Sequence, residues 1–208
     1  MESRQQLSFL GDTKPVLRPL WDQAQTLDEL AQVILVCRRC RLRDGCKQVV
    51  FGEGYHKADI VLIGEGPGQA EDEVGRPFLG RAGQLLDAIL ESVDLNRSEV
   101  FISNIVKCRP PKNRLPLPDE VRTCLPYIKA QLRIIRPKIV VCLGALAAQT
   151  LIDPGFRVTR DRGQWIIKDG LEIMPTFHPA ALLRDPRKKR PVWEDFKAIK
   201  KRYEQLKG

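Results

Sequence analysis

The chain has 208 residues and a net charge of +9, from 35 Lys and Arg against 26 Asp and Glu. Single domains commonly contain about 100 to 200 residues, which argues against a second domain. Its 43% hydrophobic content excludes a chain that is disordered throughout, and no apolar run approaches the roughly 18 residues of a membrane span. The charge favours a polyanionic partner, with nucleic acid as the leading class.

The N-terminal segment differs in character from the rest of the chain. Residues 1–25 mix polar residues with prolines and show no periodicity, so we expect a mobile tail followed by one domain at 26–208. No apolar segment follows the polar start, which argues against a secretory signal and predicts an intracellular, cytoplasmic protein. In that reducing compartment, the six cysteines indicate metal binding, catalysis or core packing, and not disulfides.

The first predicted helix begins at Thr26, where a capping box starts and apolar residues recur at helical spacing as far as Cys37. Four short apolar runs follow, each typical of a strand buried on both faces: 60–63, 100–103, 139–143 and 173–177. Helical patterns lie between and after these runs, at 82–93, 121–135, 145–151 and 192–206.

This alternation of strands and helices predicts an α/β protein: a three-layer α/β/α sandwich around a short, mainly parallel, four-stranded central sheet. Because Pro175 has no N–H to donate to a neighbouring strand, we expect the last strand to lie at an edge of the sheet.

Polar residues follow three of the four predicted strands: Glu65, Asn104 and His178. Ligands of open α/β sheets bind beyond the carboxyl ends of the strands, so these residues would converge on one pocket if the sheet is parallel. Each also has a plainer interpretation, as part of a tight turn, a strand-ending turn or an ordinary loop. Their joint placement favours a functional site.

Four of the six cysteines form two pairs that distant segments could bring to one site: Cys37 with Cys40, and Cys108 with Cys124. The first pair has the C-x2-C spacing that lets two thiolates meet one metal centre from a single turn. Spacing alone leaves zinc, an iron–sulfur cluster and separate buried cysteines open. Cys142 lies within an apolar run and is expected in the core, and Cys46 stays open, with a ligand role disfavoured.

Four motifs, in this order, resemble those of the family 4 uracil-DNA glycosylases, the iron–sulfur branch of their superfamily: GEGPG (64–68), GRPFLG (75–80), NIVKCRPP (104–111) and HPAAL (178–182). The cysteine spacing is similar too. The resemblance implies hydrolysis of the N-glycosidic bond of deoxyuridine in DNA, which releases uracil and leaves an abasic site in base excision repair. It also implies a 4Fe-4S cluster, held by the ligand set Cys37, Cys40, Cys108 and Cys124.

The resemblance further implies a set of uracil-binding residues: Glu65, Gly66, Glu71, Phe78, Asn104 and His178. In this scheme Phe78 stacks on the base, Asn104 pairs with N3 and O4, and His178 hydrogen-bonds O2. Glu71 crowds C5 and excludes thymine. Gly66 stands where the best-known branch has a water-positioning Asp, so Glu65 is our candidate for that catalytic task, beside Asn104 and His178. We expect a monofunctional enzyme without strand-cleaving activity.

A basic segment after His178 is the expected DNA contact, in which a leucine wedges into the duplex and cations meet phosphates: Leu182 or Leu183, Arg184, Arg187, Lys188, Lys189 and Arg190. A second basic stretch lies nearby: Lys107, Arg109, Lys112 and Arg114. Gln6 to Leu10 resemble the peptide with which bacterial repair proteins dock on the sliding clamp.

We expect a nucleoid-associated monomer whose substrate is uracil-containing DNA, single-stranded or duplex. The competing interpretation is a non-catalytic iron–sulfur protein that binds DNA or transfers electrons. Because electron transfer needs no base-reading pocket, the set of Phe78, Asn104 and His178 favours the enzyme.

Overall fold

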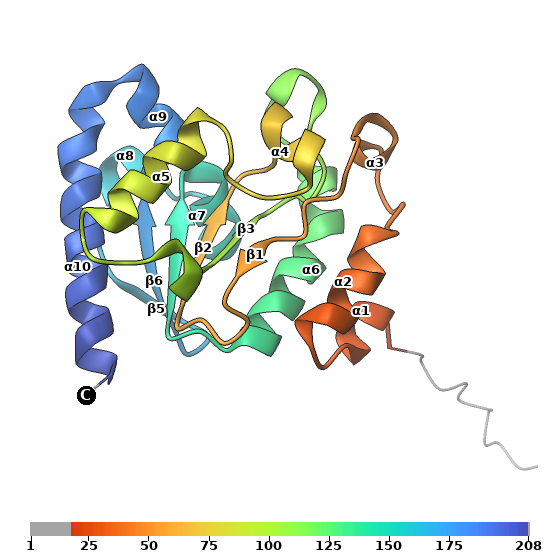
Figure 1. Cartoon of the computed structure of the whole chain (residues 1–208), viewed down its shortest axis with the longest axis horizontal. Helices are drawn as coiled ribbons and strands as arrows, with labels where there is room; N and C mark the ends of the chain where they lie inside the picture. The colour runs from red at the N-terminus through yellow and green to blue at the C-terminus, as the bar shows by residue number, and fades with distance from the viewer. Residues whose placement is uncertain (1–17, 208) are drawn as a thin grey trace, which may run out of the picture.

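The computed structural model describes residues 18–207, in which a six-stranded sheet has helices on both faces (Figure 1). The strands stand in the order β1-β3-β2-β4-β6-β5. Their bounds are Glu53–Gly54 (β1), Ile60–Gly64 (β2), Phe101–Asn104 (β3), Ile139–Leu143 (β4), Ile166–Lys168 (β5) and Leu171–Thr176 (β6). The α/β class predicted from the sequence is confirmed.

The four central strands are those that the apolar runs predict, and they pair in parallel. The outermost strands β1 and β5 pair antiparallel, so the expected count of four strands is wrong. These two strands have only two and three residues and are not buried, and therefore carry no continuous apolar run. The edge position expected for β6 is also wrong. Pro175 is tolerated there because β5 pairs only as far as Ile173.

The α-helices are α1 (Leu20–Gln23), α2 (Leu27–Leu35), α3 (Leu42–Gly45), α4 (Gln69–Val74), α5 (Arg81–Glu91), α6 (Pro118–Ile135), α7 (Ala145–Leu151), α8 (Val158–Asp161), α9 (Pro179–Arg184) and α10 (Lys189–Lys207). Short 3-10 helices lie at Arg97–Glu99, Pro111–Asn113 and Pro186–Lys188. None of these helices, within 18–207, is long and apolar enough to cross a membrane.

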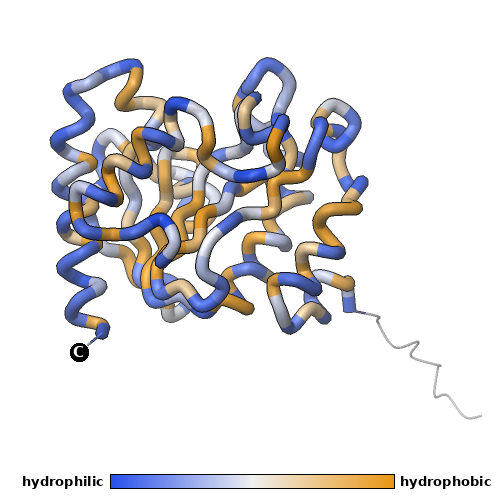
Figure 2. Tube along the Cα trace, in the orientation of Figure 1, coloured by the Kyte–Doolittle hydropathy of each residue, from blue (hydrophilic) through white to orange (hydrophobic). Residues whose placement is uncertain are grey.

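The helices form a layer on each face of the sheet because successive strand residues point to opposite faces. On β2, Val61 and Ile63 share one apolar core with α2, α6 and α7, whereas Ile60 and Leu62 share the other with α5, α9 and α10. Figure 2 shows the hydrophobic strands at the centre and the hydrophilic outer side of α10. This burial on both faces explains the continuous apolar runs in the sequence.

The N-terminal part of the described chain packs on the domain. As predicted, α2 begins with a capping interaction, in which the Glu29 N–H donates to Thr26 Oγ1 at 3.2 Å. Before it, Trp21 of α1 packs edge-to-face on Tyr127 of α6, with ring centroids 5.5 Å apart, and Ala24 is buried. These contacts place residues 20–24 with the domain and not with the expected tail. The clamp-like segment from Gln6 to Leu10 lies outside the described residues.

Candidate active site

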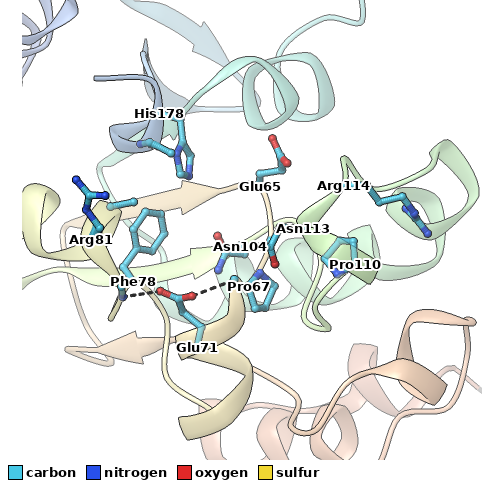
Figure 3. A pocket seen from close by; sticks show the side chains of 15 residues that line it. Glu65, Pro67, Glu71, Phe78, Arg81, Asn104, Pro110, Asn113, Arg114 and His178 are labelled. Carbon is cyan, nitrogen blue, oxygen red and sulfur yellow. Dashed lines mark hydrogen bonds between the residues drawn. The ribbon is translucent and has the colours of Figure 1, made fainter. Parts of the chain in front are cut away.

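A pocket lies at the carboxyl ends of β2, β3 and β6 and brings the residues expected to bind uracil to one place (Figure 3). They all line it: Glu65, Gly66, Glu71, Phe78, Asn104 and His178. The parallel pairing of these strands with β4 produces this convergence. The sequence analysis missed further lining residues: Arg81, Pro110, Asn113, Arg114 and Ala180. Most of these follow directly on the GRPFLG and NIVKCRPP motifs, and this proximity was the available clue.

Asn104 presents an unpaired polar atom to the pocket. The residue is 2% exposed, and its Oδ1 has no hydrogen-bond partner. Leaving a buried acceptor unpaired costs about 1–3 kcal/mol, which a ligand that donates a hydrogen bond would recover. Gly64 makes room for this side chain, because a Cβ at that position would lie 2.5 Å from Asn104 Oδ1 and 2.6 Å from the Phe78 ring.

Phe78 forms an aromatic wall of the pocket. Its ring stacks on that of His178, with centroids 5.6 Å apart and planes inclined by 29°. The residue has a φ of 54°, and a Cβ on Gly83 would lie 1.9 Å from its carbonyl oxygen, so only glycine fits at that point of α5. Arg97 donates to the Phe78 and Pro77 carbonyls and fixes the loop from behind.

Glu71 ties the loop that carries Phe78 to the glycine-rich loop (Figure 3). Its Oε2 accepts the Gly68 N–H at 3.0 Å. Its Oε1 accepts the N–H groups of Leu79 and Gly80 at 2.8 and 2.9 Å. Both carboxylate oxygens are therefore engaged by backbone amides, and the side chain forms a rigid part of the pocket wall.

His178 is held as a neutral hydrogen-bond donor. It caps α9, where its Nδ1 accepts the Ala180 N–H at 3.1 Å, so the proton of the neutral ring lies on Nε2. Burial, together with the charge of Arg184, lowers the pKa of His178 to about 4. The imidazole is therefore uncharged at neutral pH and has one N–H left to donate.

Glu65 follows β2 and faces the pocket from the side of His178 (Figure 3). Burial raises the pKa of Glu65 above its ordinary value, and Arg184 opposes that rise. A carboxylate with a raised pKa in a pocket is suited to accept a proton.

The paired cysteines line a second cavity, between α2, α6 and the segment after β3: Cys37, Cys40, Cys108 and Cys124. Tyr127 donates from its hydroxyl to Cys37 Sγ at 3.0 Å. Within 18–207, no group of three or more His, Cys, Asp and Glu could hold a single metal ion, so the sulfurs surround the cavity without converging on one point. Cys142 is in the core, as expected, and Cys46 is buried outside this lining.

The basic segments divide into exposed and buried members. Leu182 is 1% exposed in the core under α9, so its expected role as a DNA wedge is wrong, whereas the neighbouring Leu183 is 40% exposed. Lys107 is 1% exposed and is no surface cation either. Lys188 is half-buried, with its ammonium 5.4 Å from the Phe177 ring centroid. The remaining cations after α9 begins are exposed: Arg184, Arg187, Lys189 and Arg190.

Comparison with known proteins agrees with this site. The model of the uracil DNA glycosylase superfamily matches residues 51–200. The type-4 uracil-DNA glycosylase of Archaeoglobus fulgidus is 42% identical over 185 residues, covering 84% of this chain and 92% of that protein. That of Thermotoga maritima is 39% identical over 187 residues, covering 87% of this chain and 96% of that protein. The chain therefore belongs to the uracil DNA glycosylase superfamily and, within it, to the type-4 uracil-DNA glycosylases.

Proposed function

We propose that this uracil-DNA glycosylase hydrolyses the N-glycosidic bond of deoxyuridine in DNA, with the pocket at the ends of β2, β3 and β6 as its uracil site. The observation that carries the proposal is the unpaired, buried Oδ1 of Asn104 inside that pocket. A base can reach such a pocket only when its nucleotide is flipped out of the duplex.

Asn104 is the base-reading group in this proposal. Its Oδ1 accepts from uracil N3–H while its Nδ2 donates to O4, and the Phe78 ring stacks on the base. Cytosine presents an amino group to Nδ2 and a bare N3 to Oδ1, so it leaves both buried groups unpaired. Glu71 closes the pocket on the C5 side, where its carboxylate, held by three amides, leaves no room for the thymine methyl.

His178 and Glu65 supply the chemistry. Negative charge develops on uracil O2 as the glycosidic bond breaks, and the neutral Nε2–H of His178 donates to that oxygen. Glu65 accepts the proton of the attacking water, because its raised pKa leaves it basic enough for that task while still ionised at neutral pH. The products are free uracil and an abasic site, and no lysine nucleophile takes part.

The cysteine cavity fits a 4Fe-4S cluster held by Cys37, Cys40, Cys108 and Cys124. Support comes from sulfurs that surround a cavity, a size better suited to a cluster than to one zinc ion. When bound, the cluster would act as a structural centre that ties α2 to α6 and to the segment after β3. Iron and sulfide analysis, with zinc measured alongside, separates the two metal assignments.

DNA lies, in this proposal, along the exposed cations that follow α9, with Leu183 as the side chain that enters the space of the flipped base. Replacing Arg187, Lys189 and Arg190 together with alanine should reduce the slope of log affinity against log salt by about 2 to 3, because each phosphate contact contributes about 0.9. An unchanged slope would place the DNA elsewhere.

The remaining features concern where the enzyme works. We infer a monomer, one domain with its cluster, that acts at the nucleoid inside the cell. The segment from Gln6 to Leu10 would dock on a sliding clamp, which binding of the full chain and of a version without residues 1–12 would test.

The activity is tested with a duplex oligonucleotide that carries one U:G pair, followed by alkali to reveal abasic sites. We expect strand breaks at the uracil with the wild-type protein and a large loss with Asn104→Ala, with the iron absorbance of that variant intact. If the iron-loaded wild-type protein produced no breaks above background, the non-catalytic alternative would replace the enzyme.

A further inference from the structure

Lys107 lies between the uracil pocket and the cysteine cavity, with its side chain only 1% exposed. It follows β3 by three residues, in the segment that leads from Asn104 to Cys108. Lysine is almost never fully buried unless its charge is paired and hydrogen-bonded, because removing an ammonium from water is costly. The surroundings of this ammonium therefore need an explanation.

The Lys107 ammonium meets three acceptors. Nζ donates to Gln131 Oε1 at 2.7 Å, to the Asn104 carbonyl oxygen at 3.1 Å and to Ser103 Oγ. Gln131 is oriented for this contact, because its Nε2 donates to the Phe51 carbonyl at 2.9 Å and leaves Oε1 facing the lysine. Three acceptors match the three donors of a protonated amine.

On its other side, Lys107 lines the cysteine cavity. Its charge lies close enough to Cys124 to lower the pKa of that thiol, and the Cys124 sulfur also accepts the backbone N–H of Lys107. Cys124 and Gln131 stand seven residues apart on α6 and so share one face of that helix. One side chain therefore connects a proposed cluster ligand with the backbone of the base-reading asparagine.

We propose that Lys107 is a positioning residue that couples the cluster to uracil recognition. Its bond to the Asn104 carbonyl fixes the end of β3 and, with it, the direction of the Asn104 amide. Its charge offsets the negative charge of a cluster with four thiolate ligands. The second of these roles rests on the cluster proposed above, whereas the first does not depend on it.

Packing alone does not call for a charge at this position. The same cavity is lined by apolar side chains such as Ile34 and Val49, and an apolar residue of similar length would avoid the cost of desolvation. Methionine is such a residue, so Lys107→Met removes the charge and the donors while it keeps most of the volume. Lys129, exposed on α6, provides the matched control Lys129→Met.

The test compares these variants as iron-loaded proteins in three measurements: single-turnover excision, affinity for uracil-containing DNA, and the reduction potential of the cluster. We expect Lys107→Met to excise uracil about ten to a hundred times more slowly, as for the loss of a charged hydrogen bond, with its DNA affinity unchanged. Its potential should become more negative, because a nearby positive charge stabilises the reduced cluster. Lys129→Met should match the wild type in all three.

Lys107→Arg keeps the proposal testable if the methionine variant loses its cluster. Arginine retains the charge, but its planar fork does not match three acceptors around one nitrogen, so excision should fall while the potential stays near that of the wild type. Wild-type excision by Lys107→Met, or by Lys107→Arg where the first variant is unstable, would overturn the positioning role. An unmoved potential in Lys107→Met would overturn the charge role.

Failure of the cluster proposal gives a different result. Wild-type protein that holds no iron would refute the cluster itself, and the excision rates would still decide whether Lys107 positions Asn104.

Discussion

Replacing Glu71 with glutamine separates the hydrogen bonds of this side chain from its bulk. In the native protein Oε2 accepts one backbone N–H, from Gly68, and Oε1 accepts two, from Leu79 and Gly80. Glutamine has a single side-chain oxygen. Glu71→Gln can therefore keep the bonds on one side only, and its NH2 group must face a backbone donor on the other side.

The magnitude follows from this geometry. Glu71 is 9% exposed, so water does not replace the lost partner, and a hydrogen bond to a charged group contributes about 1.5–3 kcal/mol. We expect a loss of about 2 kcal/mol in the free energy of unfolding, which lowers the unfolding midpoint by about 4 to 8 °C for a chain of this size. Because the Leu79 N–H holds the loop that carries Phe78, uracil excision should also slow by about tenfold.

The assay combines thermal unfolding with single-turnover excision from oligonucleotides that contain uracil or thymine. Glutamine fills the volume of glutamate, so Glu71→Gln should still reject thymine, whereas Glu71→Ala opens the C5 side and should begin to release it. Glu73→Gln, exposed on the same helix, is the control. If Glu71→Gln matched the wild type in both unfolding midpoint and uracil excision, the carboxylate would not be what holds the two loops.

Three further changes test other parts of the site. Excision should decline as the pH falls through the raised pKa of Glu65, above 4.5, because the carboxylate is the base; a pH series with Glu65→Gln should lack this acidic limb. Gly64→Ala should slow excision by about tenfold or more and leave the iron absorbance intact, since its Cβ would lie 2.6 Å from an aromatic carbon of the pocket; wild-type kinetics would mean that the pocket has room for a methyl group there. Cys124→Ser should lose the absorbance at visible wavelengths and unfold at a lower temperature, whereas Cys46→Ser should keep both, and bleaching of the latter would mean that the ligand set is wrong.

The sequence predicts the site better than its surroundings, for a physical reason. Asn104 and His178 end buried parallel strands, and the carboxyl ends of such strands meet at one edge whatever the rest of the fold does. The inward face of a short helix is different, because it depends on how the helix docks. Leu182 and Leu183 are adjacent and chemically identical, and only the placement of α9 decides which is buried.

Lys107 shows the same limit for charge. Its neighbours in the sequence give it the appearance of a surface cation, while its acceptors on β3 and α6 lie up to 24 residues away along the chain. The short strands β1 and β5 were missed for a related reason, since partners elsewhere in the sheet, and not their own apolar content, define them as strands.

The segment 104–108 joins recognition and metal binding more tightly than its length suggests. Beyond the end of β3, the Ile105 N–H donates to the Gly64 carbonyl at 2.9 Å and the Val106 N–H to the Glu65 carbonyl at 3.2 Å. The base-reading amide, the backbone of the proposed catalytic base and the proposed ligand Cys108 are thus held by one run of five residues. A shift at the cysteine cavity must move this run or break its hydrogen bonds. Loss of the cluster should therefore disturb Asn104 and Glu65 together, although neither touches the cavity.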